Sequence, residues 1–590
     1  MKQTSALLVF LLAVWMQSIA QTIPSDRVTD WSKAGHTDTL PVFSTTINIM
    51  NHGAVADGTT ANDTAFANAL SALNGQPGTI YFPAGNYLFK KPINIYRDSI
   101  VLKGEGASSK LAFDIGGPVD MINIIGSIDN TTYNTTTTVN KGDNTVKVNN
   151  GGDFSVGSYV FITDNDKILT TSAWAAGSTG QVLKIISISG NDLTVENKLR
   201  RNYTLNNTPV LKKLTLVKDV GIECMYIERK DATTDQTNNI TFDKTVDCWV
   251  TGIESYNSNF AHVAVRHSTH ALLRGNYMHH AHAYGGNGKA YGTLVEYGSG
   301  ECLIENNIFE HLRHSMLVQS GANGNVFAYN YSFDPYWDEP PFPTNSAGDI
   351  VCHGNYPYLN LFEGNIIQSI VIDDSHGING PFNTFFRNRA QLYGIFTNAN
   401  PASDSMNYVG NEITSTLPGL AYYLLNGKGH FEYGNNVKSV IAPVGTNTIS
   451  EKSLYLQAEP GYWLAHNTFP SIGAPHDYNT GRNSAIDRHD NNLPTDCTKN
   501  PVYTSIKSVS QEDMGILVSP NPFNNLVHIS ASISSAFTYR IYNTTGQILK
   551  EGSITTGNST IETAELSSGL YILKVRNTQG TCAVFKLLKK

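Results

Sequence analysis

The sequence predicts an all-β protein whose main part is a right-handed parallel β-helix, a solenoid in which each coil contributes three short strands. A capping helix, an inserted β-module and a small C-terminal β-sandwich complete the predicted architecture. Three observations support this fold class. The 590-residue chain exceeds the usual size of one globular core and is rich in Gly (50) and Tyr (29). Its apolar residues form short β-type runs without a 3.6-residue period. One segment also repeats at an interval that suits one coil.

Residues 1–20 are predicted to be a signal peptide. Lys2 precedes an apolar run over residues 6–16, and Ser18 and Ala20 supply small residues for cleavage. The run is too short for a membrane-spanning helix. No later stretch is long enough to span a bilayer, so the mature chain is expected to have no transmembrane segment.

The β-helix is predicted to cover residues 41–495 and to begin with a cap. A solenoid would otherwise expose the core of its first coil. Residues 62–73 read as the capping helix: Asn62 or Asp63 is the expected N-cap, and Phe66, Ala69, Leu70 and Leu73 form one apolar face. Residues 140–215, approximately, contain alternating strands and are expected to form a β-module inserted beside the helix.

An internal repeat sets the expected register of the coils. Residues 353–365 and 376–388 align when shifted by 23 residues, and both segments begin with His-Gly and end with Asn. The same terminal asparagine is expected in other coils, at Asn276, Asn307, Asn330, Asn365, Asn388, Asn411, Asn435 and Asn467.

These asparagines are predicted to form an inner ladder in which each amide bonds to the next coil. Asn325, Asn360 and Asn383 form a second predicted column, and Phe327, Phe362 and Phe385 an apolar one. All of them are interpreted as structural.

The six cysteines are widely scattered and contain no C-x-x-C pair, which excludes a zinc knuckle or a dense disulfide framework. Most are expected to be small buried residues. A bridge between Cys224 and Cys248 is left open.

After a predicted linker at 496–515, residues 516–590 form a separate β-segment. It contains Pro-Asn-Pro at 520–522, Tyr-Asn-Thr-Thr-Gly at 542–546 and Ser-Gly-Leu-Tyr-Ile-Leu-Lys-Val at 568–575. In this order, at the chain end, these motifs resemble the C-terminal sorting domain of the Bacteroidetes type IX secretion pathway. The resemblance implies outer-membrane secretion machinery as a partner and a secreted or cell-surface location.

The capping region carries a second resemblance. Gly-Ala-Val-Ala-Asp-Gly at 53–58 and Gly-Thr-Ile-Tyr-Phe-Pro-Ala-Gly at 78–85 are similar to the opening of the pectate-lyase-like β-helix superfamily related to glycoside hydrolase family 28. The resemblance covers the first coils and implies the fold. It also implies an extracellular polysaccharide as the partner. The net charge of −8 and the lack of a basic stretch argue against nucleic acid.

Polar residues suited to chemistry concentrate in about four adjacent coils. When positions are counted from the repeating asparagine of each coil, His353 and His376 share a register, and so do His314 and Asp349. The predicted catalytic residues are Arg313, His314, His353, His376, Asp349 and Asp374. The predicted substrate-binding residues are Lys289, Tyr291, His282, Tyr336 and Trp337. Replacing His314 or His353 by alanine is expected to abolish turnover while leaving stability nearly unchanged.

No cofactor follows firmly from the sequence. Asp349, Asp373 and Asp374 could bind calcium or simply cap a turn, and both interpretations stay open. The histidines at 279, 280 and 282 do not make a zinc site, because adjacent strand residues point to opposite faces and at most two would converge.

Three functions compete. A lyase that cleaves a uronic-acid-containing polysaccharide by β-elimination needs a cation for the carboxylate, a base and a proton donor, and the Arg, His and Tyr candidates supply these types. A hydrolase of the polygalacturonase type needs separated carboxylates. That family has Asn-Thr-Asp, Asp-Asp, Gly-His-Gly and Arg-Ile-Lys motifs on separate coils. In this chain Ser375 stands where the first glycine of Gly-His-Gly is expected, and Arg387-Asn388-Arg389 stands in place of Arg-Ile-Lys, so the motif set is incomplete. A non-catalytic glycan-binding adhesin is the third alternative. The lyase is the preferred interpretation.

Overall fold

The structure is a computed structural model in which residues 22–339, 347–398, 403–498, 516–531, 537–543, 547–554, 558–577 and 582–590 are described. The predicted signal peptide lies outside them. The chain forms two compact units, residues 1–499 and 500–590. Within the described residues, no helix combines the length and apolar character needed to cross a membrane.

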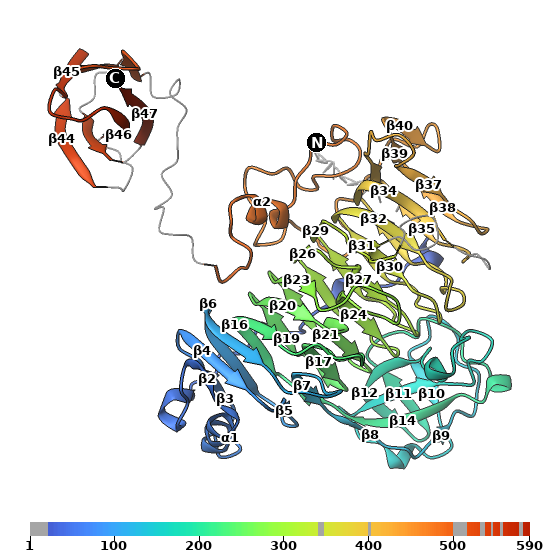
Figure 1. Cartoon of the computed structure of the whole chain (residues 1–590). Coiled ribbons are helices and arrows are strands. Elements are labelled where there is room, and N and C mark those ends of the chain that lie inside the picture. Colours follow the sequence, from blue (N-terminus) through green and yellow to red (C-terminus); the bar gives the residue numbers. More distant parts are fainter. Residues whose placement is uncertain are drawn as a thin grey trace, which may run out of the picture. The chain divides into compact units, whose positions relative to one another are not determined.

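The first unit is a right-handed parallel β-helix with three sheets (Figure 1). Successive coils pair in parallel register, so each sheet runs the length of the stack. The first sheet contains β1 (Thr46–Asn48), β3 (Gly78–Tyr81), β6 (Ile100–Phe113), β16 (Gly221–Arg229), β19 (Trp249–Thr251), β22 (Leu272–Arg274), β25 (Leu303–Glu305), β28 (Val326–Ala328), β31 (Leu361–Glu363), β33 (Thr384–Phe386), β35 (Asn407–Val409) and β38 (Phe431–Tyr433).

Four long strands belong to two sheets each. Strands β6 and β16 continue from the first sheet into the second, and β32 and β34 continue from the second sheet into the third. The second sheet adds β2 (Asp57–Ala61), β4 (Gly85–Phe89), β20 (Glu254–Ser258), β23 (Tyr277–Ala281), β26 (Ile308–Glu310), β29 (Tyr331–Phe333), β32 (Ile366–Ile372), β34 (Arg389–Thr397), β36 (Glu412–Ile413), β39 (Asn435–Val437) and β40 (Val440–Ala442). The third adds β5 (Ile93–Ile95), β7 (Ile122–Ile125), β17 (Ile240–Asp243), β21 (Ala261–Arg266), β24 (Tyr291–Glu296), β27 (His314–Val318), β30 (Gly348–Cys352) and β37 (Tyr422–Leu424). A short pair, β15 (Val217–Lys218) and β18 (Thr245–Val246), lies between coils.

The predicted asparagine ladder is confirmed from Asn276 to Asn435. Each side-chain amide donates to the Oδ1 atom of the next asparagine at 2.9–3.1 Å. The second column is also confirmed, because Asn325 donates to Asn360 and Asn360 to Asn383, both at 2.9 Å. Phe327, Phe362 and Phe385 stack with ring centroids 5.0 and 5.2 Å apart. Asn467 is the exception: it lies outside the ladder and donates to Asp487 instead.

Removing one ladder amide should be costly. The Asn365 side chain accepts hydrogen bonds from the backbone and side chain of Asn330 and donates to Phe327 O and Asn388 Oδ1. An Asn365→Ala change leaves these fully buried groups unpaired, so we expect the free energy of unfolding to fall by about 3 kcal/mol or more. Thermal unfolding measures it, with the exposed Asn426→Ala as the control. An equal, small effect of both changes would contradict the ladder's role.

The first coil is capped by α1 (Asp63–Ala72), as the sequence predicts. Asn62 occupies the N-cap position, but its Oδ1 atom accepts from the Val55 backbone and not from the helix. Phe66 and Ala69 of α1 join the main core of the solenoid.

The insertion is an antiparallel module with its own apolar core. It starts earlier than expected, at Ser127, and ends at Thr215. Its strands are β8 (Ser127–Ile128), β9 (Tyr133–Asn134), β10 (Thr145–Lys147), β11 (Tyr159–Thr163), β12 (Gln181–Ser189), β13 (Asp192–Val195) and β14 (Val210–Thr215).

Two irregular segments cover the outside of the first sheet. At the N-terminal end, Trp31 is buried and donates from its indole to Leu359 O at 2.8 Å. After β40, residues 443–498 return along the solenoid as a strap that contains α2 (Ser484–Asp490). Tyr455 and Trp463 of the strap share an apolar cluster with Trp31 and Tyr329.

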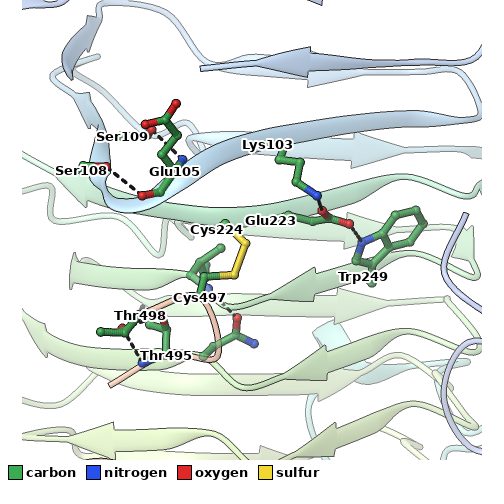
Figure 2. The surroundings of a disulfide bond; sticks show 12 residues. Lys103, Glu105, Ser108, Ser109, Glu223, Cys224, Trp249, Thr495, Cys497 and Thr498 are labelled. Carbon is green, nitrogen blue, oxygen red and sulfur yellow. Dashed lines mark hydrogen bonds and ion pairs between the residues drawn. A yellow bond between two sulfur atoms is a disulfide. The ribbon is translucent and has the colours of Figure 1, made fainter. Parts of the chain in front are cut away.

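A disulfide joins Cys497 at the end of the strap to Cys224 in β16, 273 residues earlier (Figure 2). The alternative bridge between Cys224 and Cys248 is therefore wrong, since Cys248 is a free buried thiol. Sequence spacing could not find the true pair, because it forms only after the chain has turned back along the stack. Cys302 and Cys352 are also free and buried, as expected.

The second unit has two antiparallel sheets around one apolar core. One sheet contains β41 (Ile516–Ser519), β42 (Leu526–Ala531) and β45 (Asn558–Glu562). The other contains β43 (Phe537–Tyr542), β44 (Ile548–Ile554), β46 (Gly569–Asn577) and β47 (Cys582–Lys589).

Candidate functional site

A cleft of about 640 Å³ opens where strands of the third sheet end. Its walls come from the solenoid, the inserted module and the loops near residues 286–288 and 337–339. The described residues that line it are Trp174, Gln236, Phe260, Arg266, Gly286, Asn287, Gly288, Tyr291, Glu296, Tyr297, Arg313, Gln319, Trp337, Glu339, His353, Asp373, Ser375 and His376.

A row of polar side chains forms the floor of the cleft. Each follows the last core residue of a strand, so parallel pairing places them in adjacent coils: Arg266, Glu296, Gln319, His353 and Asp373. Arg266 Nε lies 2.7 Å from Glu296 Oε1, and Gln319 donates to Glu296 Oε2 at 2.7 Å. The row is therefore held rigidly by contacts between its own members.

His353 and Asp373 form the chemically most pronounced pair in this row. Nδ1 of His353 lies 2.5 Å from Asp373 Oδ2, and Asp373 Oδ1 accepts from the backbone of Ser375 and from Asn398. Burial alone would raise the pKa of Asp373, but the adjacent His353 ring holds it well below its ordinary value. The carboxylate thus stays ionised and engages Nδ1, which leaves Nε2 as the nitrogen available to a ligand.

Arg313 supplies a cation beside this pair. Its guanidinium lies over the Trp337 ring, 4.1 Å from the centroid, and donates to Gly285 O at 3.2 Å. Its buried Nε atom has no hydrogen-bond partner among the described residues. A guanidinium carries five N–H donors, so most of its capacity is free for an anionic ligand.

Two further predicted residues line the cleft near His353. The His376 ring contacts His353 edge-on, with centroids 4.9 Å apart, although the strand register pairs His353 with Asp373. Burial and then the charge of His353 lower the pKa of His376. Burial raises the pKa of Tyr291 to about 12, so its hydroxyl stays protonated at neutral pH.

His314 lies behind the cleft and does not line it. Its ring is buried, lies 5.6 Å from the His353 ring, and Nδ1 is 3.2 Å from Gly348 O. Burial, followed by the charges of Arg313 and His353, lowers its pKa well below the ordinary value. His314 is therefore placed to support His353 and has no direct access to a ligand.

Asp349 and Asp374 do not reach the cleft either. The sequence predicted that His314 and Asp349 share a register, but His314 pairs with Gly348, so Asp349 lies one residue out of that register. Its carboxylate accepts hydrogen bonds from Ser332 Oγ and from two backbone amides. Asp374 accepts from Asn379 and Ser403. Burial raises the pKa of both carboxyl groups to about 6.

Three predicted substrate-binding residues lie elsewhere. Lys289 is buried and donates to the carbonyl oxygens of residues 233–235, and His282 lies 3.0 Å from Arg229 O. Tyr336 is 42% exposed and stacks on His311, outside the cleft lining. Only Tyr291 and Trp337 of this group face the cleft.

The three aspartates considered for calcium do not fit that ion together. The carboxylates of Asp349 and Asp374 accept hydrogen bonds from separate partners, and the carboxylate of Asp373 contacts His353. In the described part of the chain, no three acidic, His or Cys side chains are arranged to hold a metal ion. Calcium ligation needs several oxygens around one point, which this arrangement does not provide.

Sequence reasoning missed several lining residues. Arg266, Glu296 and Gln319 could have been found, because each directly follows an apolar strand end in the same register as His353. Trp174 could not, since it lies in the inserted module and no repeat points to it. Its ring is 47% exposed and contacts His376 and Tyr297 edge-on, with centroids 6.3 Å apart in both cases.

Family models match both ends of the chain. Residues 46–150 match the model described as "Rhamnogalacturonase A/epimerase, pectate lyase-like", and residues 517–590 match the "Secretion system C-terminal sorting domain". No curated protein matches the chain in sequence.

Solved structures similar to this chain have low sequence identity. The tailspike protein gp49 from Pseudomonas phage LKA1 is 14% identical, with a TM-score of 0.43, over 66% of this chain and 83% of that one. The catalytic unit of the GH87 α-1,3-glucanase from Streptomyces thermodiastaticus is 12% identical, with a TM-score of 0.32, over 67% and 70%. The surface adhesin PfbA of Streptococcus pneumoniae is 10% identical, with a TM-score of 0.30, over 67% and 92%.

The N-terminal match agrees with the parallel coils described above, and the C-terminal match coincides with the second compact unit. The chain is a secreted or cell-surface protein in which a pectate-lyase-like β-helix precedes a secretion system C-terminal sorting domain.

Proposed function

We propose that the cleft binds a uronic-acid-containing polysaccharide and cleaves it by β-elimination, so that the protein is a polysaccharide lyase. The observation that carries this proposal is the His353–Asp373 pair, which faces the cleft beside Arg313 and Tyr291. These groups match the three requirements of the reaction: a cation for the carboxylate, a base and a proton donor.

Arg313 is assigned to the uronate carboxylate. Charge neutralisation there acidifies the neighbouring C–H bond by stabilising the enolate-like transition state. The stacking on Trp337 and the hydrogen bond to Gly285 O support this role, because they hold the guanidinium in place where Arg313 lines the cleft.

His353 is assigned as the base. Its Nε2 atom takes the proton from C5 of the uronate, the C4–O4 bond breaks, and a C4–C5 double bond forms. The leaving oxygen receives a proton from Tyr291, whose raised pKa keeps it protonated, and the tyrosine is restored from solvent. Asp373 orients the ring and stabilises the imidazolium.

Two of the three described carboxylates that line the cleft, Asp373 and Glu296, are unsuited to the acid role of a hydrolase, and the third is Glu339. A hydrolase needs one protonated carboxyl group as the acid and a second carboxylate across the bond. Asp373 has a lowered pKa, and Glu296 is paired with Arg266 and Gln319. The two buried aspartates with raised pKa values, Asp349 and Asp374, do not line the cleft.

The test is incubation of the full chain with polygalacturonate, rhamnogalacturonan and alginate. We expect ultraviolet absorbance from the unsaturated uronate to rise together with reducing ends. New reducing ends without that absorbance would indicate a hydrolase, and binding without either would indicate an adhesin. Both outcomes overturn the proposal.

Arg313→Ala should lower kcat/KM on the cleaved polymer by about 10²- to 10³-fold, as removal of a donor to developing charge does elsewhere. Arg313→Lys should restore part of it. On the methyl-esterified form of the polymer, the loss should be much smaller, because no carboxylate charge needs neutralising. The change Lys428→Ala, at an exposed residue, serves as the control. An equal loss of kcat/KM on both polymers would contradict the assignment of Arg313 to the uronate carboxylate.

A further inference from the structure

We propose that the protein has a second glycan-binding surface, outside the cleft, that takes neutral sugar units. The surface lies on the outer side of the second sheet. We call it the ring face and define it by six residues: Tyr226, Tyr256, Tyr277, His279, His280 and His311. It binds without cleaving and does not depend on the chemistry assigned to the cleft.

The parallel register builds the ring face. Tyr256 of β20 pairs with His279 of β23, and their rings lie 5.0 Å apart. Tyr277 is two residues before His279 on the same side of β23, and these two rings stack at 4.1 Å. Tyr226 of β16 is in register with Glu254 and Tyr277, and its ring lies 6.4 Å from the Tyr256 ring. Because neighbouring strands are about 4.8 Å apart, side chains in one register are brought into ring contact.

A second column of rings comes from His280, near the end of β23, and His311, directly after β26. His280 and His311 occupy the left-handed turn position in successive coils, with φ of 60° and 51°. Their rings stack at 4.9 Å, and Tyr336 stacks on His311 at 4.5 Å. All six residues have an intermediate exposure, and the His279 and His311 side chains are 12% and 24% exposed.

Carboxylates alternate with these rings. His279 Nε2 lies 3.3 Å from Glu254 Oε1, His311 Nδ1 lies 2.7 Å from Asp334 Oδ2, and Tyr277 donates to Glu310. Aromatic faces offer flat platforms to the C–H side of a sugar ring, and carboxylate oxygens accept hydrogen bonds from its hydroxyl groups. The same negative charges disfavour a polyuronate. Neutral sugars therefore suit the ring face, whereas the cationic cleft suits acidic ones.

The position of the ring face supports a glycan occupant. Further along the same sheet, Tyr331 and Phe333 are covered by His489 of the strap, with centroids 5.2 and 4.5 Å away. The six ring-face residues lie in β16, β20 and β23 and directly after β26, and they keep an intermediate exposure. It also meets the cleft through one loop, in which Tyr336 stacks on His311 and the next residue, Trp337, stacks on Arg313. A polysaccharide with acidic and neutral units could then contact both surfaces.

Affinity electrophoresis of the full chain in gels that contain galactan, arabinan, xyloglucan or polygalacturonate tests the proposal. We expect retardation by at least one neutral glycan, and about 10-fold weaker binding after Tyr256→Ala with Tyr277→Ala, since two aromatic contacts to the sugar are then lost. His353→Ala should bind the neutral glycan normally. Uronate cleavage by the ring-face variant on short oligomers should be unchanged.

Retention of all neutral-glycan binding in the double variant would overturn the proposal, and so would absence of retardation in every neutral gel. Equal loss of polygalacturonate retardation in the ring-face double variant would overturn the assignment to neutral sugars. If the double variant unfolds, the single change Tyr256→Ser, which removes one half-exposed ring, gives the same readout with circular dichroism as the check on folding.

Discussion

His353→Ala should lower kcat on the cleaved uronate polymer by about 10³-fold or more, with little change in thermal stability. A positioned general base contributes about 10²- to 10⁴-fold, and no other imidazole in the cleft has a carboxylate within 4.0 Å. Although only 6% of His353 is exposed, the residue lines the cleft, so its truncation widens the cleft and leaves no closed cavity. Initial rates of ultraviolet absorbance and a melting curve give the two readouts.

Asp373 and His314 provide controls for this result. Asp373→Asn keeps the shape of the partner but removes the charge that stabilises the imidazolium. We therefore expect a 10- to 100-fold loss of kcat, taking the effect of outer-shell partners as a guide. His314→Ala should instead lower stability, because the ring is buried against the Gly348 backbone. A His353→Ala enzyme that keeps its rate would refute the assigned base.

Opening the Cys224–Cys497 disulfide should lower the stability of the β-helix by about 3–5 kcal/mol, because it closes a loop of 273 residues and so restricts the unfolded chain. The folded state should also change locally. The bond holds the end of the strap over Gly252, where a side chain would collide with Cys497. Reduction should therefore make residues 443–498 accessible to protease before the coils unfold.

Limited proteolysis with mass spectrometry and a melting curve measure both effects. The Cys224→Ser, Cys497→Ser double variant should match the reduced wild-type chain and show no further response to reductant. A strap that stays protected in that variant would show that its apolar contacts alone hold it. The activity of the cleft should change little at low temperature, since no strap residue lines it.

The sequence predicted the coil arrangement well because the asparagines repeat with the coil itself. It predicted the site less well, because turns differ in length between coils. Val318 lies 12 residues before Asn330, but its partner Cys352 lies 13 before Asn365. The single extra residue falls between Cys352 and Asn360 and puts Asp349 in register with Ser315, on the opposite face from His314. In a strand, a shift of one residue exchanges the two faces.

Other parts of the site had no sequence signal of this kind. Trp174 reaches the cleft only because the loop that carries it is fixed on the solenoid, where the backbone amides of Thr171 and Ser172 donate to Asn355 Oδ1 at 3.0 and 3.2 Å. Lys289 and His282 were plausible ligand-binding residues by type. Their polar atoms instead satisfy backbone carbonyl groups of neighbouring loops, a use that composition and spacing do not reveal.

The way the stack of coils ends has a consequence for assembly. Every parallel coil presents a row of N–H and C=O groups to the next, so an open terminal coil would accept a strand from another molecule and start a fibril. Here α1 packs into the core at one end, and β40 folds back antiparallel on β39 at the other. A reversed last strand offers a poor template for a further parallel coil. The second sheet can thus be long and repetitive without offering its last parallel strand to another molecule.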